Sequence, residues 1–388
     1  MHKVNASPSP SRARPWRVAV IDHFRNKARG GHGLHEAFIG LPGVTICAVA
    51  DPDEPSRRSL LADTGAAAMY EDWRELLDRE KPDVVCICSR LPVQHPEVVV
   101  AAAEAGCHIY CEKPFATDLC QADRMIAAAD AAGVKLAVAH LARYWESFHT
   151  ARRMIRDGEI GRPLLAYCRG KEDDRGGGED MMVLGTHLFD SARFLLGDPN
   201  WVFGHVSRDR RDITRADASE PTEPVGTVAG DEIVAMFGFP ENVHCHFESR
   251  RGMFDGKQWR FGMTVVGTRA TLAFRYGEGD RVLRISRSTQ PFEEGGDFVL
   301  ADETPLPAIA GAAPLKPEET GSGIWAYYKR CNRRAAWDLL CAATENREPV
   351  CSGRDARWTL EMVHGVYASH LAGKKLALPL SERRHPLQ

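Results

Sequence analysis

The sequence predicts two successive architectures: an α/β domain with a parallel, doubly wound sheet, then an α+β domain with a large, mostly antiparallel open sheet. In the first 139 residues, short buried-strand patterns alternate with helical patterns, as in a parallel sheet whose connections are helices. Beyond about residue 140, strand patterns follow one another without long helices between them, which favours antiparallel pairing. A chain of 388 residues is long enough for two such domains.

Five short apolar runs predict the strands of the first domain. They span residues 18–21, 44–50, 84–88, 108–111 and 135–139. The helical patterns between them span residues 55–64, 73–80, 95–105 and 119–132. Ligands bind at the carboxyl ends of such strands, and Asp51, Ser89 and Lys113 stand at three of these ends.

The second domain is predicted from strand patterns separated by turn signals. The strands span residues 164–170, 232–238, 243–250, 259–267 and 270–275. Helices are expected at residues 325–344 and 355–371, and a loop at 290–320. Helices would cover one face of this sheet, and its apolar other face predicts a homo-oligomer.

Composition excludes several classes of protein. The net charge of −3 gives no electrostatic reason to expect nucleic acid or an anionic membrane. No run approaches the eighteen or so apolar residues that span a bilayer. Several of the 11 cysteines lie in predicted core strands and no pair of Cys-x-x-Cys units occurs, which favours a reducing, cytoplasmic location. Residues 1–15 have the composition of a disordered tail.

Cys111-Glu112-Lys113-Pro114 is the most informative segment. A lysine beside a carboxylate at the end of a buried strand is costly in a core, so it indicates a ligand site. The following proline pushes Lys113 out of helical geometry and can adopt the cis form. The alternative is a lysine that merely terminates a strand.

The expected phosphate loop after the first strand is irregular. A dinucleotide fingerprint would place glycines directly after residue 21, but here they come late, at residues 30–33. The loop therefore needs to be longer, or to hold phosphate through Arg25, Lys27 or Arg29. Asp51 can bind the ribose hydroxyls of NAD, although it can equally cap a helix. Arg57 and Arg58 leave NADP open.

His187 lies in the segment Gly185-Thr186-His187-Leu188-Phe189-Asp190 and has a suitable ordinary pKa for a general base. Asp190 can contact substrate or cap and pair within its own helix. Arg143, after the fifth strand, can bind substrate hydroxyls or form an ion pair at the domain boundary. Glu179, Asp180 and His187 offer ligands for a divalent ion, with a solvated acidic loop as the alternative.

These motifs together resemble the glucose–fructose oxidoreductase/inositol dehydrogenase/rhizopine-catabolism (Gfo/Idh/MocA) family. The matching segments are Ala50-Asp51, Glu112-Lys113-Pro114, Gly185-x-His187-x-x-Asp190, and residues 266–270 and 345–358. The resemblance implies an NAD(P)-dependent dehydrogenase or reductase of sugars, cyclitols or their derivatives, usually a dimer or tetramer. It implies a dinucleotide-binding, Rossmann-like domain over residues 16–139 and a substrate-binding and oligomerisation domain over residues 140–388.

Two departures from the family pattern stand out. Asp22, Arg25 and Lys27 replace the small residues expected in the phosphate loop, and Val183 stands where an aspartate four residues before the histidine is usual. These departures leave two alternatives open. One is redox-neutral elimination or isomerisation of a keto sugar, with a retained nucleotide or a divalent metal; the other is a non-catalytic nucleotide- or sugar-binding regulator.

The expected roles of the site residues are as follows. Lys113 and His187 are the catalytic cation and base. Residues expected to contact the cofactor, NAD with NADP possible, are His23, Phe24, Arg25, Asp51, Ser89, Arg90, His95 and Glu112. Residues expected to contact the sugar-like substrate are Arg143, Lys171, Asp180 and Asp190.

Overall fold

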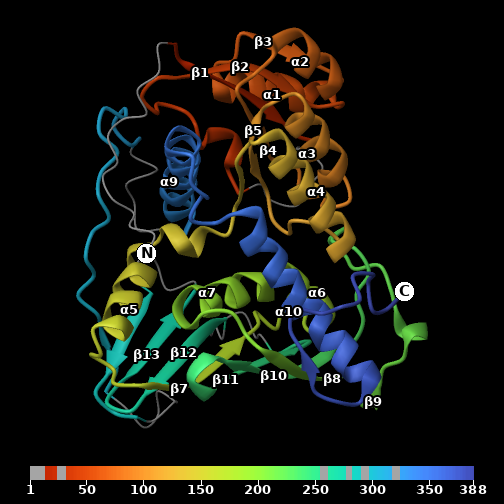
Figure 1. Cartoon of the computed structure of the whole chain (residues 1–388), viewed down its shortest axis with the longest axis vertical. Coiled ribbons are helices and arrows are strands. Elements are labelled where there is room, and N and C mark those ends of the chain that lie inside the picture. The colour runs from red at the N-terminus through yellow and green to blue at the C-terminus, as the bar shows by residue number, and fades with distance from the viewer. Residues whose placement is uncertain (1–13, 24–31, 254–260, 277–281, 290–296, 317–323) are drawn as a thin grey trace. The chain divides into compact units, whose positions relative to one another are not determined.

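The computed structural model describes residues 14–23, 32–253, 261–276, 282–289, 297–316 and 324–388. It contains two compact units (Figure 1). The first unit comprises Met1–Ala116, Cys120–Tyr144 and Leu306–Ala356, and the second comprises Thr117–Leu119, Trp145–Pro305 and Arg357–Gln388. Most of the expected tail lies outside the described residues. No helix in the described part of the chain is long and apolar enough to cross a bilayer.

The first unit contains a six-stranded sheet in the order β3-β2-β1-β4-β5-β6. All neighbouring strands are parallel. The strands are β1 (Trp16–Ile21), β2 (Val44–Ala50), β3 (Ala68–Tyr70), β4 (Val84–Ile87), β5 (His108–Cys111) and β6 (Leu136–Val138). The central strands are buried on both faces because their side chains are almost all apolar. The predicted parallel, doubly wound sheet is confirmed.

Helices connect these strands as predicted. Those of the first unit are η2 (Leu34–Glu36), α1 (Glu54–Thr64), α2 (Trp73–Glu80), α3 (His95–Glu104), α4 (Leu119–Ala132), η3 (Leu141–Tyr144) and α9 (Ile324–Glu345). Asp53 and Asp72 cap α1 and α2 with their side chains. The short edge strand β3 was not predicted, because three half-exposed residues carry too little pattern.

Helix α9 belongs to the first unit although it lies far along the chain. It contacts β5 and β6, whereas α3 contacts β4 and β5. Figure 1 shows α3 and α9 on opposite sides of these strands. The predicted boundary near residue 139 did not anticipate that residues 306–356 pack with the parallel sheet.

The second unit contains a ten-stranded sheet in the order β15-β14-β13-β12-β7-β11-β10-β8-β16, with β9 paired to β8. Among the described strands of this second sheet, only β7 and β11 pair in parallel. The strands are β7 (Pro163–Arg169), β8 (Trp201–Arg208), β9 (Arg211–Asp212), β10 (Glu232–Phe239), β11 (Val243–Arg250), β12 (Gly262–Gly267), β13 (Thr271–Arg275), β14 (Leu283–Ser286), β15 (Val299–Leu300) and β16 (Leu376–Ala377). The mostly antiparallel sheet is confirmed, although five of its strands were not predicted, namely β8, β9, β14, β15 and β16; β15 lies within the segment that was expected to be a loop.

Helices lie on one side of this sheet in Figure 1. They are α5 (Glu146–Arg156), α6 (Gly178–Asp180), the π-helix η4 (Met181–Gly185), α7 (Thr186–Leu196) and α10 (Gly353–Ala372), with short 3-10 turns η5 (Arg215–Asp217) and η6 (Pro240–Asn242) elsewhere. The other face retains exposed apolar side chains, since Phe203 and Val234 are 43% and 40% exposed.

Candidate active site

Three of the predicted site residues lie at the carboxyl ends of the parallel strands in the first unit. Asp51 follows β2, Ser89 lies two residues beyond β4, and Lys113 lies two residues beyond β5. A cavity of about 190 Å³ opens beside the ends of β1 and β4. Its lining residues are Ile21, Asp22, His23, Trp73, Arg74, Ile87, Ser89, Gln94, Glu97 and Val98. This is the edge at which a doubly wound sheet binds ligand.

Asp51 is fully buried and does not cap the following helix. Its Oδ1 accepts a hydrogen bond of 2.8 Å from the backbone N–H of Asp53, and Asp53 is the residue that caps α1. The Asp51 charge also favours protonation of the nearby His23 ring, although burial dominates and lowers the pKa of His23. Asp51 therefore lies at the sheet edge and supports the residue that caps α1, without capping the helix itself.

His95 connects two loops of this edge. Its Nε2 lies 2.8 Å from the carbonyl of Ser89 and its Nδ1 lies 2.9 Å from the carbonyl of Phe115. The ring is fully buried, and burial lowers its pKa. Because both ring nitrogens face backbone carbonyls, His95 holds the loops after β4 and β5 together. This role differs from the expected direct contact with a cofactor.

Glu112 and Lys113 are both 1% exposed, which is rare for charged side chains. Glu112 Oε1 accepts 2.8 Å and 3.1 Å contacts from the backbone N–H of Lys113 and from His32 Nδ1. Burial opposes the charge of Glu112, but His32 and Lys113 hold the pKa of this carboxyl below its usual value. The Lys113–Pro114 peptide bond is cis.

Helix α9 supplies two residues to this cluster that the sequence pattern did not single out. Asn332 is fully buried; its Nδ2 donates to the carbonyl of His32 at 2.7 Å and its Oδ1 accepts from the Tyr110 hydroxyl at 2.7 Å. The ring of Tyr328 lies 5.7 Å from that of His32. Burial, with a contribution from Glu112, raises the pKa of Tyr328 to about 12.

The remaining expected cofactor contacts divide into two groups. Phe24 and Arg25 lie outside the described residues. Arg90 is half-buried, and its charge disfavours protonation of His32, whose pKa is lowered chiefly by burial. The structure therefore brings His32, Arg90, Glu112 and Lys113 into one charged neighbourhood.

In the second unit, His187 lies on α7 directly after a π-helical turn. The π-helix spans Met181–Gly185 and contains Val183, which is buried. Such turns are rare and occur often at functional sites. His187 is half-buried, and its carbonyl accepts a 2.7 Å hydrogen bond from the Ser191 hydroxyl.

Asp180 is fully buried, and both of its carboxylate oxygens accept hydrogen bonds. The Ser249 hydroxyl donates at 2.6 Å, and the backbone N–H groups of Glu172 and Lys171 donate at 3.1 Å and 3.3 Å. Burial raises the pKa of Asp180 despite these donors. The Lys171 ammonium lies 3.1 Å from Asp173. This arrangement ties the segment before α6 to β11 and does not support substrate contact by Asp180.

Glu179 has a similar role one residue earlier. Its carboxylate accepts from the Thr222 backbone and hydroxyl at 3.0 Å and 2.5 Å, and from the Glu223 backbone at 2.9 Å. The preceding glycines allow close packing, since a Cβ on Gly178 would lie 2.3 Å from the Ala229 carbonyl. Glu179, Asp180 and His187 do not form a group of neighbouring ligand atoms in the described part of the chain. The divalent-ion hypothesis therefore has no structural support at these residues.

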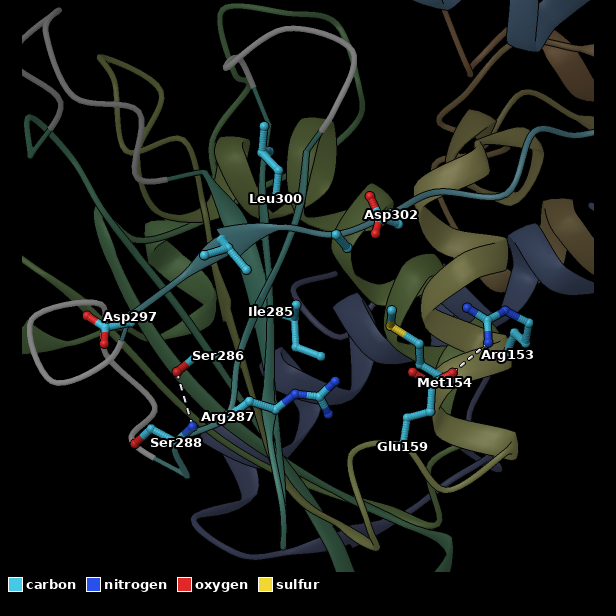
Figure 2. A pocket seen from close by; sticks show the side chains of 12 residues that line it. Arg153, Met154, Glu159, Ile285, Ser286, Arg287, Ser288, Asp297, Leu300 and Asp302 are labelled. Carbon is cyan, nitrogen blue, oxygen red and sulfur yellow. Dashed lines mark hydrogen bonds and ion pairs between the residues drawn. The ribbon is translucent and has the colours of Figure 1, made fainter.

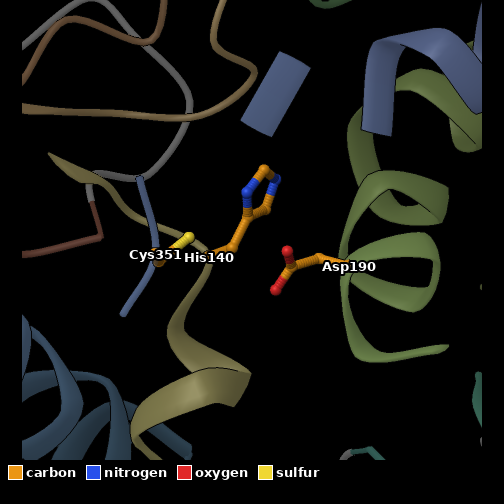
Figure 3. A group of neighbouring side chains, drawn as sticks. All are labelled: His140, Asp190 and Cys351. Atoms are coloured by element: carbon orange, nitrogen blue, oxygen red, sulfur yellow. The ribbon is translucent and has the colours of Figure 1, made fainter. Parts of the chain in front are cut away.

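Figure 3 draws another set of potential ligands, of which His140 and Cys351 belong to the first unit. Their ligand atoms lie within 4.8 Å of each other. Two donors are fewer than the three or four protein ligands of a zinc site, so we assign no metal site to that unit within its described residues. Asp190, also drawn, belongs to the second unit.

Two further residues expected to bind substrate form ion pairs within their own units. Arg143 Nη1 lies 3.1 Å from Asp355 and 3.0 Å from the carbonyl of Val350. Asp190 is fully buried and lies 4.0 Å from Arg193 on the same helix. For Asp190 this is the pairing within its own helix that the sequence had left open, whereas the Arg143 pair lies within the first unit and not at the domain boundary.

The second unit also contains a larger pocket, of about 800 Å³, between α5 and the strands β14 and β15 (Figure 2). Arg153, Glu159, Arg287 and Asp302 are among its lining residues. Charges of both signs line it, and it contains none of the residues expected to bind cofactor or substrate. We assign it no role.

Comparison with known families identifies the chain. The family described as "Oxidoreductase family, NAD-binding Rossmann fold" matches residues 27–140. The family described as "GFO/IDH/MocA C-terminal domain" matches residues 148–273. The chain belongs to the GFO/IDH/MocA oxidoreductase family. The predicted resemblance is confirmed, and with it an NAD-binding Rossmann domain in an oxidoreductase.

Two curated relatives and one solved structure extend this result. D-apiose dehydrogenase from Paraburkholderia graminis is 28% identical over 91% of this chain and 88% of its own length. Myo-inositol 2-dehydrogenase from Thermotoga maritima is 29% identical, over 39% of this chain and 48% of its own length. Levoglucosan dehydrogenase, solved with NADH and levoglucosan, aligns with a TM-score of 0.73 at 21% identity, covering 95% of this chain and 100% of that one; at this identity it shows the fold alone.

Proposed function

We propose that this member of the family is an NAD-dependent oxidoreductase that acts on a secondary hydroxyl or keto group of a sugar, cyclitol or glycoside. The observation that carries the proposal is Lys113, a charged side chain only 1% exposed at the carboxyl end of β5, beside an ionised Glu112. A cation at this edge is suited to polarise a carbonyl or stabilise an alkoxide. The names of the curated relatives, dehydrogenases of apiose and of inositol, support the substrate class.

The residues of the sheet edge fit a dinucleotide. Asp51 offers a buried carboxylate at the end of β2 for the ribose hydroxyls, and His23 and Ser89 line the cavity beside it. When bound, NAD supplies the chemistry of hydride transfer. We expect NAD to be preferred over NADP, because a 2′-phosphate would meet the charge of Asp51.

Two side chains take the other roles. Lys113 stabilises negative charge on the substrate oxygen, and His187 accepts the hydroxyl proton in the oxidation direction. The first belongs to the parallel-sheet unit and the second to the unit with the larger sheet. We therefore assign dinucleotide binding to the first unit, with residues 306–356 packed onto its sheet, and we assign the proton acceptor His187 to the second unit.

We also propose that the chain forms a homo-oligomer through the open face of the larger sheet. Exposed Phe203 and Val234 lie there on neighbouring antiparallel strands, and exposed apolar patches commonly mark such interfaces. Light scattering at micromolar concentration should give a dimer or tetramer; a mass of 42.9 kDa, that of one chain, would refute the interface.

The functional proposal is tested by absorbance at 340 nm with NAD and a panel of aldoses, cyclitols and anhydrosugars. We expect net formation of NADH with at least one member of the panel, and calorimetry should show tighter binding of NAD than of NADP. Tight NAD binding without net NADH formation would contradict the proposal and favour a bound nucleotide recycled within one turnover. Absence of binding at millimolar NAD would contradict both.

A further inference from the structure

The surroundings of Glu112 differ from those of a residue that contacts a cofactor. Its carboxylate is 1% exposed, and Oε1 accepts from both the backbone N–H of Lys113 and the ring of His32. One oxygen therefore connects the backbone of the expected catalytic lysine to a histidine 80 residues away in sequence.

We propose that His32 and Glu112 form a positioning pair that fixes the backbone of Lys113 and keeps its ammonium charged, and that α9 holds this pair through Asn332. The proposal rests on the proposed function only in taking Lys113 to act on substrate. It assigns to Glu112 a role different from the cofactor contact that the sequence suggested.

His32 is held at both ends. Its ring contacts Glu112 at 3.1 Å, and its carbonyl accepts from Asn332 at 2.7 Å. The same Asn332 accepts from the hydroxyl of Tyr110, which lies two residues before Glu112 on β5. These hydrogen bonds join Tyr110 on β5 to Asn332 on α9, Asn332 to His32, and His32 to Glu112. Because the chain of contacts begins and ends on the same segment, the Glu112 carboxylate has little freedom to rotate. Because Lys113 follows Glu112 directly, the direction of the lysine side chain is fixed with it.

The chemistry also defines the hydrogen position on His32. Burial lowers the pKa of His32, so its ring is neutral at pH 7. An ionised carboxylate can only accept hydrogen bonds. The hydrogen therefore lies on Nδ1, and the ring donates it to Glu112 Oε1. This tautomer is a specific and measurable consequence of the pair.

The carboxylate also balances a buried cation. An ammonium that is 1% exposed loses most of its hydration, which favours the neutral amine. A neighbouring negative charge opposes this loss. The charge of Glu112 also acts on Cys88, His95, Tyr110, Cys111 and Tyr328. Burial disfavours the charged form of all five groups, so each is neutral at pH 7. The charged Arg90 acts instead on His32 and Tyr328.

The first test reads the pair without any enzymatic turnover. ¹⁵N-histidine NMR of the full chain without nucleotide should show His32 as the Nδ1–H tautomer at pH 7, with assignment by loss of its signals in His32→Asn. Glu112→Leu, which removes the acceptor that faces Nδ1, should remove this tautomer preference. An Nε2–H tautomer or an imidazolium for His32 at pH 7 would overturn the proposal.

The second test separates positioning from charge. Glu112→Gln keeps an acceptor for the Lys113 N–H but removes the charge, so kcat/KM should fall by about 10- to 100-fold and its alkaline limb should move to lower pH. His32→Leu should lower kcat with little change in KM, and His32→Asn, which keeps a donor near Nδ1, should recover most of the loss. His35→Leu is the matched control, because its ring faces Glu36 and Asp63 instead; it should leave the alkaline limb in place.

The two tests also keep this proposal separate from the functional one. If no sugar is oxidised but His32 shows the Nδ1–H tautomer, the functional proposal fails and the pair stands. If sugars are oxidised and the alkaline limb of Glu112→Gln matches that of the wild type, the pair fails and the function stands.

Discussion

Both units of this protein bury acidic side chains, but the groups that stabilise the buried carboxylates differ between the two units. In the first unit, Glu112 is 1% exposed and lies between a histidine and a lysine. In the second, Glu179 is 6% exposed and accepts from two backbone N–H groups and one threonine hydroxyl. Glu112 is balanced chiefly by two side chains that can titrate or move, although it also accepts one backbone N–H. Glu179 is balanced chiefly by backbone N–H groups, with one threonine hydroxyl.

Glu112 and Glu179 have the same residue type and are both buried. Their hydrogen-bond partners are what distinguish a functional carboxylate from a structural one. A carboxylate whose oxygens already accept hydrogen bonds from several backbone N–H groups has few acceptor sites left for a ligand, and it holds loops together. A carboxylate beside a buried lysine changes the charge state and direction of a group that can act on a ligand. We therefore expect changes in the first cluster to affect turnover, and changes in the second to affect stability.

The largest expected effect concerns Lys113 and His187. Lys113→Ala and His187→Ala should each lower kcat by roughly two to four orders of magnitude, because each removes charge stabilisation or proton transfer in the transition state. The affinity for NAD should change little, since neither residue is assigned to the pyrophosphate. Steady-state kinetics and calorimetry measure the two quantities.

The double variant gives the control for this prediction. Its loss should be far smaller than the product of the single losses, because the two groups serve one transition state. Wild-type turnover in either folded single variant would show that the pair is structural.

Asp180→Ala should instead destabilise the fold by about 2–4 kcal/mol. The change leaves the Ser249 hydroxyl and two backbone N–H groups without their acceptor in a buried site, and unsatisfied buried donors are costly. Urea unfolding measures the loss, and kcat per folded molecule should stay within a few-fold of wild type. A loss of turnover comparable to that of Lys113→Ala, with unchanged stability, would show that Asp180 belongs to the active site.

Two buried histidines should make the stability of the second unit depend on pH. His364 and His385 lie with ring centroids 4.5 Å apart, and burial lowers the pKa of His385 to about 4, against a partial opposing effect of Asp118. The unfolded chain therefore binds a proton between pH 6.5 and 4 that the folded chain does not. The contribution of His385 to stability is complete above pH 6.5 and falls by roughly 2–3 kcal/mol as the pH drops to 4.

Chemical denaturation from pH 7.5 to 4.5 measures this effect. The second unit should lose stability steadily below pH 6.5, and His385→Gln should make the dependence shallower. His364 should account for a remaining slope, because burial lowers its pKa as well. An equal slope in wild type and His385→Gln would contradict the assignment of this pH dependence to His385.

The smallest predicted effect is that of Asn332→Ala. It removes two hydrogen bonds of 2.7 Å, to His32 and from Tyr110, and should cost about 1–2 kcal/mol of stability. Because His32 is then held at its ring alone, its tautomer preference should weaken and kcat should fall by less than in Glu112→Gln. Fluorescence-monitored unfolding and histidine NMR measure the two results; a fully retained tautomer preference would show that α9 does not hold the pair.

Much of the fold followed from local pattern. The parallel strands were predictable because a sheet buried on both faces needs continuous apolar runs, and Asp51, Ser89 and Lys113 followed from the rule that ligands bind at strand ends. The membership of α9 in the first unit was not predictable, because nothing in residues 324–345 indicates which sheet their apolar face covers. Strand β8 was missed because its alternating residues include glycine and histidine.

The site was less predictable than the fold. His32 and Asn332 were not chosen, since a histidine beside glycines and an asparagine within a helix have no distinctive local pattern. Glu179 and Asp180 suggested ligands because two adjacent acids in a glycine-rich loop resemble a metal or substrate site. Their true partners, Thr222 and Ser249, come from distant segments, and only the folded chain reveals them.

The most direct test of this account compares Glu112→Gln with Glu179→Gln, the same substitution at two buried glutamates. For each variant, kcat/KM and the free energy of unfolding are measured together. We predict that Glu112→Gln lowers kcat/KM by about 10- to 100-fold with less than about 1 kcal/mol loss of stability. Glu179→Gln should lose about 1–3 kcal/mol of stability and keep near wild-type kcat/KM per folded molecule. The reverse pattern, with turnover lost at Glu179 and stability lost at Glu112, would contradict the account.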